Sequence, residues 1–295
     1  MTAPARGFAA RLAARAFVVT SELVPPRGAD AAAVERSVAA LAFADGLNIT
    51  DLPRARPRMS ALAAAAIAVA AGAEPILQMT CRDRYRIALA ADALGAAAVG
   101  VGAVLPLGGD PLPEGAPGVA VGDLDAAGLV RLLTDLAAGI LPDGSRVEGP
   151  PPRLLVGAAA SPGFTPPASL AAKVATGAAF VQTQVSLDPD RFEEWVAGLR
   201  AASALGAAAL LPSVVVPASA RSVELVAGFG AQVAAGVAER AEAGEGEAVA
   251  REIVDRLVAI PEVRGVHVLA IGSDSAAAAR LADHARTVAA ASERA

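Results

Sequence analysis

The chain has a single cysteine, Cys81, which excludes an internal disulfide and any zinc or iron–sulfur site built from several cysteines. Aromatic residues are only 3% of its 295 residues, so Ala and Val must fill most of its hydrophobic interior. No cluster of Lys and Arg offsets the net charge of -5, which argues against nucleic acid and anionic membranes as partners. The apolar run at 61–73 is too short for a membrane span. We therefore expect a cytoplasmic protein.

Short β-branched runs alternate with longer helical stretches rich in Ala and Leu, which is typical of repeated βα units. Asp30 and Ser60 stand where they can cap two of the helices. The pattern predicts a single (β/α)8 TIM barrel over residues 1–295, with residues 1–15 as a flexible N-terminal extension. Eight strands are expected, at 16–23, 47–50, 75–81, 98–106, 154–159, 179–184, 208–216 and 266–271.

Polar and charged residues gather at the carboxyl ends of these predicted strands, where a parallel barrel forms its active site. They fall in six segments, at 20–28, 48–51, 58–60, 74–84, 108–111 and 182–184. Taken in this order, the segments resemble the methylenetetrahydrofolate reductase family from about Phe17 to about Ile271. The resemblance implies reduction of 5,10-methylenetetrahydrofolate to 5-methyltetrahydrofolate, with hydride relayed by FAD from NADH or NADPH.

Glu22 is the candidate general acid. A carboxyl group in an apolar barrel mouth loses solvation, so its pKa rises and it can donate a proton near neutral pH. From the residues alone, Glu22 can equally cap the next loop or pair with Arg27. The resemblance assigns it the acid role in opening the five-membered ring of the folate.

Asp110 and Gln184 are the candidate folate contacts. Asp110 follows two glycines, and an Asp before a Pro is also an ordinary turn residue. Side chains alternate along a strand, so Gln182 and Gln184 share one face and Thr183 lies on the other. One of these two faces must point into the barrel. An amide there can bind a pterin, or it can be a barrel residue satisfied by the backbone. The resemblance places a pterin-binding carboxylate at Asp110 and a pterin-binding amide at Gln184.

The candidate cofactor contacts form a polar ring around the ends of strands two and three. Arginine suits the pyrophosphate of FAD because it offers paired donors. The alternative is that Asp83 caps a helix and the neighbouring arginines are solvated. The resemblance implies that FAD is held by Thr50, Asp51, Thr80, Arg82, Arg84, Asp110 and Lys173.

Three departures from the family pattern concern the cofactor. Gln78 stands where many members have His, and residues 160–164 replace a Tyr and a His. No aromatic residue follows the seventh strand in 217–221. These departures keep two alternatives open. One is the same reaction without bound flavin, with hydride from NAD(P)H or from an electron-transfer partner subunit, and the other is a non-catalytic folate-binding paralogue. Homo-oligomerisation also stays open.

Overall fold

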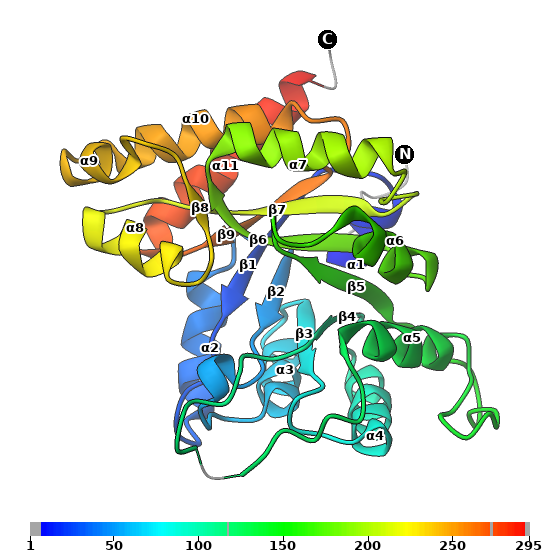
Figure 1. Cartoon of the computed structure of the whole chain (residues 1–295). Coiled ribbons are helices and arrows are strands. Elements are labelled where there is room, and N and C mark those ends of the chain that lie inside the picture. The colour runs from blue at the N-terminus through cyan, green and yellow to red at the C-terminus, as the bar shows by residue number, and fades with distance from the viewer. Residues whose placement is uncertain (1–6, 117, 272–273, 293–295) are drawn as a thin grey trace, which may run out of the picture.

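Eight parallel strands close into a barrel around which the helices are arranged (Figure 1). The computed structural model describes residues 7–116, 118–271 and 274–292. Neighbouring strands pair in the order β5-β4-β3-β2-β1-β9-β7-β6, and pairing of β5 with β6 closes the ring. The barrel strands are β1 (Val18–Leu23), β2 (Gly46–Ile49), β3 (Pro75–Thr80), β4 (Ala103–Leu107), β5 (Leu155–Ala160), β6 (Phe180–Leu187), β7 (Ala209–Val215) and β9 (Gly265–Leu269).

The predicted (β/α)8 barrel is confirmed, and the predicted strands match the observed ones closely. The fourth strand begins later than expected, because α4 continues to Ala98 and a turn at Gly100 separates it from β4. After β7 the chain forms two short helices, α8 (Ala220–Ala227) and α9 (Val237–Glu242). The two-residue strand β8 (Gln232–Val233) lies between them and pairs with the end of β6 outside the barrel.

Helices connect the strands and cover the outside of the barrel. Asp30 and Ser60 accept hydrogen bonds from backbone N–H groups of the first turns, so both expected caps are present. No helix in the described part of the chain is both long and apolar enough to cross a membrane. The helical elements are α1 (Phe8–Ala13), α2 (Ala31–Ala40), η1 (Pro53–Ala55), α3 (Ala61–Ala70), α4 (Arg86–Ala98), α5 (Ala126–Ala137), α6 (Pro167–Ala175), α7 (Pro189–Ala201), α8 (Ala220–Ala227), α9 (Val237–Glu242), α10 (Gly246–Val258) and α11 (Ser275–Ser292).

Helix α1 lies within the extension expected at 1–15, of which residues 1–6 are outside the described part of the chain. Its first residue, Phe8, is almost fully buried and meets the ring of Phe180 edge to face, at 5.2 Å between centroids. The two rings pack with Val18 and Ile76, which lie near the amino ends of their strands. An apolar side chain reaching back from α1 thus fills this end of the barrel. At this end, two aromatic rings fill the interior that the composition predicted would be filled by small side chains.

Candidate functional site

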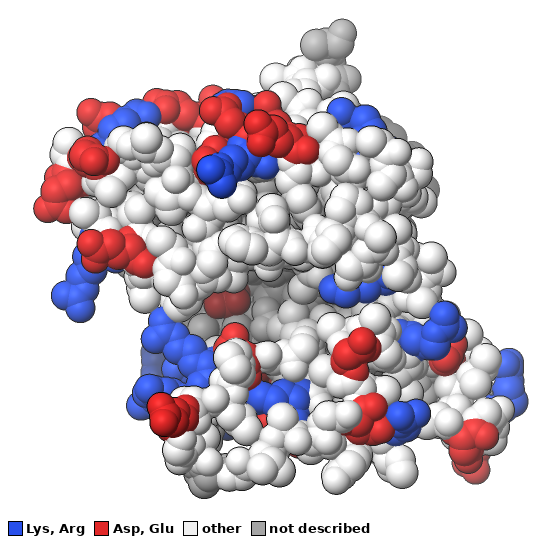
Figure 2. Space-filling view, in the orientation of Figure 1, with Lys and Arg blue, Asp and Glu red and all other residues white. Residues whose placement is uncertain are grey.

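The candidate residues lie at the carboxyl end of the barrel, as expected. Glu22 is near the end of β1, Asp51 follows β2, and Thr80 ends β3. Asp110 follows β4, and Gln184 lies in the second half of β6. Figure 2 shows a hollow in the middle of the molecule, with acidic and basic side chains in and around it. The roles of these residues remain predictions, and the contacts below indicate which of them are available to a ligand.

Glu22 has no cation among its recorded partners. Side chains alternate along a strand, so Glu22 points the same way as Thr20, whose hydroxyl contacts His267 inside the barrel. Burial raises the pKa of Glu22 from 4.5 to about 7, and a hydrogen bond from Gln78 acts in the opposite direction. Glu22 therefore holds a proton near neutral pH, which a general acid must do.

Asp51 is the centre of a structural network. One of its carboxylate oxygens accepts from the backbone N–H of Thr80 at 2.7 Å, from the Thr80 hydroxyl at 3.0 Å and from Arg84. The side chain is only 4% exposed. The network ties the carboxyl end of β2 to that of β3, so Asp51 and Thr80 hold this part of the mouth in shape.

The two arginines after β3 already have partners. Arg82 donates to both carboxylate oxygens of Asp83 and, at 2.7 Å, to the backbone carbonyl of Asp110. Arg84 pairs with Asp51 and with Asp92. The alternative reading of Asp83 as a cap for α4 is wrong, because α4 begins at Arg86 and Asp83 instead binds Arg82. Neither arginine is solvated in the way that reading assumed.

Lys173 and Thr50 are turned toward the protein. The ammonium group of Lys173 donates to the backbone carbonyl of Ala159 at 3.1 Å, and burial lowers its pKa. Thr50 is buried, and its hydroxyl oxygen has no hydrogen-bond partner among the described residues. The Thr50 hydroxyl is thus unpaired among the described residues but not exposed to a ligand at the surface.

Asp110 and Gln184 are joined to neighbouring loops by two residues that the sequence analysis missed. The Asp110 carboxylate accepts from the backbone N–H of Arg54, in the loop after β2. The Gln184 amide donates at 3.3 Å to the backbone carbonyl of Phe229, in the loop after α8. The Arg54 guanidinium lies 4.8 Å from the centre of the Phe229 ring, which completes the connection.

The loop that carries Arg54 has a strained backbone. Leu52, Arg54 and Ala55 have φ angles of 49°, 58° and 53°, in the left-handed region that side chains other than glycine rarely adopt. Each such residue costs on the order of 1–3 kcal/mol. Gly109 also has a positive φ, of 88°, but a glycine adopts it freely, and its missing Cβ leaves room for Arg82 and Thr80.

Gln182 belongs to a polar layer inside the barrel, together with Thr20, Asn48 and His267. The Asn48 amide nitrogen donates to Gln182 at 2.7 Å and contacts His267 Nδ1 at 3.0 Å. An irregularity in the pairing of β6 with β7 separates Gln182 from Gln184, which bonds to Phe229 instead. Burial lowers the pKa of His267 to about 3, so its ring is neutral. Its Nε2 atom and the Asn48 oxygen have no hydrogen-bond partner in the described part of the chain.

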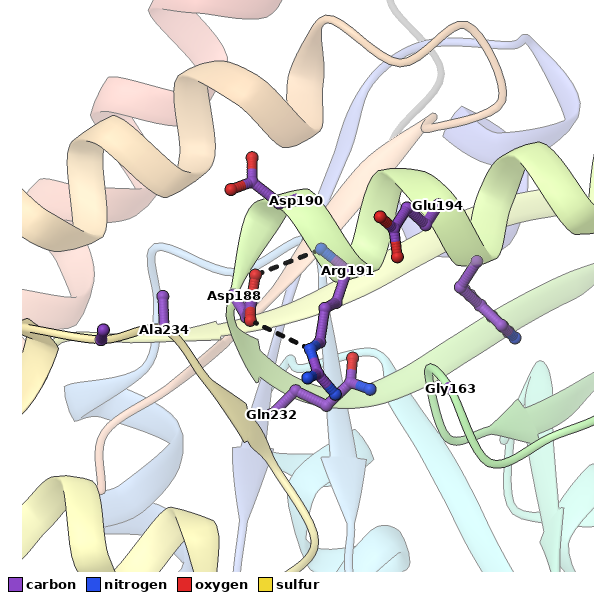
Figure 3. A pocket seen from close by; sticks show the side chains of 9 residues that line it. Gly163, Asp188, Asp190, Arg191, Glu194, Gln232 and Ala234 are labelled. Carbon is purple, nitrogen blue, oxygen red and sulfur yellow. Dashed lines mark hydrogen bonds and ion pairs between the residues drawn. The ribbon is translucent and has the colours of Figure 1, made fainter.

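A separate groove of about 740 Å³ lies beside α7 (Figure 3). Asp188 caps α7 through the backbone N–H of Arg191 and also faces the Arg191 side chain at 3.6 Å. Asp190 pairs with Arg256. None of the predicted site residues lines this groove, and these two acidic residues have structural partners. Within the ranges described, no group of His, Cys, Asp and Glu is arranged to hold a metal ion.

Replacing Glu22 by Gln should change how stability depends on pH. The pKa of Glu22 is about 7 in the folded protein and about 4.5 when unfolded, so the folded state binds more protons between these values. The wild type therefore loses stability as pH rises through this window, whereas the amide in Glu22→Gln cannot titrate. Between pH 4.5 and pH 8, we expect the free energy of unfolding of the wild type to fall by on the order of 2–3 kcal/mol relative to that of Glu22→Gln. Urea unfolding across that range measures it, with the exposed Glu114→Gln as control. Parallel curves for wild type and Glu22→Gln would show that the carboxyl is solvated.

Replacing Asp51 by Asn should destabilise the barrel mouth. The change keeps the shape but removes the charge that Arg84 and the Thr80 donors share, and we expect a loss of about 2 kcal/mol in the free energy of unfolding. Asp92→Asn is the matched control, because Asp92 binds the same arginine from a more exposed position and should cost less than about 1 kcal/mol. Equal losses for the two variants would contradict the central role of Asp51.

Comparison with known proteins supports the family and the fold. No curated protein matches the sequence of this chain. A protein from Clostridium thermocellum that binds two copies of 5-methyl-5,6,7,8-tetrahydrofolic acid has a similar structure, with a TM-score of 0.67 and 12% identity over 94% of this chain and 98% of that one. Tryptophan synthase from M. tuberculosis is also similar, with a TM-score of 0.51 and 16% identity over 94% of each chain. At these identities the likeness shows the fold alone.

The sequence itself carries the family assignment. The model of the methylenetetrahydrofolate reductase family matches residues 8–281, which include every candidate residue described above. This chain belongs to the methylenetetrahydrofolate reductase family.

Proposed function

We propose that this protein reduces 5,10-methylenetetrahydrofolate to 5-methyltetrahydrofolate, with Glu22 as the general acid. The observation that carries the proposal is a carboxyl group at the carboxyl end of β1 whose pKa is raised to about 7. A family match over 8–281 supports the reaction class, and the similar protein from Clostridium thermocellum binds the product of this reaction.

In the proposed reaction, protonation of the folate precedes transfer of hydride to it. The Glu22 proton passes to the amine nitrogen of the five-membered folate ring as the bond from that nitrogen to the methylene carbon breaks. The bonding electrons stay on this nitrogen, and the methylene carbon becomes part of an iminium. Hydride from the nicotinamide then adds to this carbon, which gives the methyl group and NAD(P)⁺. Glu22 is protonated again from solvent.

Asp110 and Gln184 are the proposed folate contacts. A carboxylate accepts hydrogen bonds from the amino and ring N–H groups of a pterin, and an amide both donates and accepts. Both residues lie at the same end of the barrel as Glu22 and come from different strands, so they can orient the folate relative to the acid. Asp110 is exposed and Gln184 is partly buried.

The residues expected to hold FAD do not fit that role as they are placed. Arg82 and Arg84 are paired with carboxylates, Asp51 is occupied by Thr80 and Arg84, and Lys173 donates to a backbone carbonyl. A pyrophosphate would have to replace these partners. We therefore derive no step through a flavin and propose that NADH or NADPH supplies hydride directly to the folate.

Glu22→Gln should abolish most of the activity while leaving folate binding nearly unchanged. Gln keeps the shape of the side chain but cannot donate the proton, and loss of a general acid costs about two to four orders of magnitude in rate. Single-turnover kinetics with methylenetetrahydrofolate and NAD(P)H measure the rate, and calorimetry with 5-methyltetrahydrofolate measures binding. Wild-type turnover by Glu22→Gln would show that another group supplies the proton.

Turnover should need no flavin. We expect purified protein to show no flavin absorbance band and to catalyse NAD(P)H-dependent reduction of methylenetetrahydrofolate, and added FAD should not raise the rate. Titration of FAD, followed by quenching of its fluorescence, should show no saturable binding. Tight FAD binding with turnover that depends on it would restore the relay by flavin and show that the arginines exchange partners.

A further inference from the structure

Residues 52–56, between β2 and α3, cross the barrel mouth and are called the strap here. Two contacts hold the strap in place at Arg54. Its backbone N–H donates to the Asp110 carboxylate, and its guanidinium lies over the Phe229 ring at 4.8 Å. Phe229 is itself tied to the mouth, because its carbonyl accepts from the Gln184 amide. One chain of contacts thus joins the loops after β2, β4 and α8.

The chain of contacts uses several of the polar atoms that were assigned to the folate. One oxygen of the Asp110 carboxylate, Oδ2, accepts from the Arg54 N–H, and the Gln184 amide nitrogen donates to the Phe229 carbonyl. The Gln184 oxygen also accepts, from the backbone N–H of Val185 at 2.9 Å. A folate that binds these same atoms must therefore displace the strap and the Phe229 segment, or share the atoms with them.

The strap is held in a conformation that its own residues disfavour. Three of its five residues, Leu52, Arg54 and Ala55, have left-handed φ angles, and none of them is glycine. Arg82 donates to the Leu52 carbonyl over a long 3.5 Å, and the contacts of Arg54 are also weak ones. Asp110 and Arg54 are exposed, and the Phe229 side chain is 37% exposed, so water competes for both interactions. Backbone strain and weak exposed contacts together make a segment that opens easily.

We propose that the strap is a lid that closes over the folate site when no ligand is bound, and that folate opens it by taking Asp110 and Gln184 from Arg54 and Phe229. Folate binds only the open molecules, so its apparent affinity equals the intrinsic affinity multiplied by the fraction of molecules whose lid is open. This inference rests on the proposed function for the identity of the ligand. The closing contacts themselves do not depend on it.

Two variants weaken the lid without touching Asp110 or Gln184. Arg54→Ala removes the guanidinium but keeps the backbone N–H, and Phe229→Ala removes the ring but keeps the carbonyl. Their controls are Arg56→Ala, in the same segment, and Leu225→Ala, an exposed apolar side chain on α8. Hydrogen exchange of the amides at 52–58 reports opening without any ligand. Calorimetry with 5-methyltetrahydrofolate reports affinity.

We expect faster exchange at 52–58 in both test variants and an affinity about three- to tenfold tighter than that of the wild type, with both controls unchanged. Unchanged exchange in Arg54→Ala and Phe229→Ala would overturn the lid. Weaker folate binding by Arg54→Ala would overturn it too, because Arg54 would then be a ligand contact. Faster exchange, with no folate binding by any variant or by the wild type, would support the closing contacts but reject both folate as the ligand that opens the lid and the proposed function.

Discussion

Closure of the sheet is the constraint on which the whole site depends. The strands pair in a row that runs from β5 to β6, and these two would be its opposite edges if they did not also pair with each other. Four residue pairs, from Gly157 with Phe180 to Ala160 with Thr183, make that closing contact. Gly157 permits it, because a side chain there would collide with the Phe180 ring. Through this contact Gln184 comes to the same mouth as Glu22 and Asp110.

The closed barrel also explains why one carboxyl group behaves differently from the others. Asp51, Asp83 and Asp110 all accept hydrogen bonds from N–H groups, and two of them face arginines. Glu22 has a neutral amide, Gln78, as its hydrogen-bond partner and is partly buried at the mouth of the barrel. Similar side chains at one end of a barrel therefore divide into those that hold loops through N–H donors and one, Glu22, whose raised pKa suits it to give up a proton near neutral pH.

The sequence was most informative where a physical rule acts locally. Alternation of β-branched and Ala-rich segments predicted the eight strands, and the rule that active sites form at the carboxyl ends of barrel strands predicted where Glu22, Asp110 and Gln184 lie. The sequence did not reveal partners that come from distant segments. Arg84 looked available for phosphate because its partner Asp51 lies 33 residues before it, whereas the partner of Arg82 is the adjacent residue Asp83.

Phe229 and Arg54 were missed for the same reason. Neither belongs to a periodic pattern, and no spacing in the sequence links residue 54 to residue 229. The departure at Gln78 was visible, but its contact with Glu22 depends on the barrel, in which β2 separates β1 from β3. The bend that separates Gln182 from Gln184 was also invisible, because strict alternation places both residues on one face.

The polar layer of Thr20, Asn48, Gln182 and His267 has a consequence for how the barrel assembles. These residues come from four strands, β1, β2, β6 and β9, and hydrogen bonds join them in an interior that is otherwise mostly apolar. If the register of one strand shifted by a single residue, a buried amide or imidazole on that strand would lose its hydrogen bond, and so would the residue that bonded to it. Apolar Ala and Val side chains are interchangeable and tolerate such slips. The four polar residues therefore specify one register of the strands among the several that hydrophobic packing alone would accept.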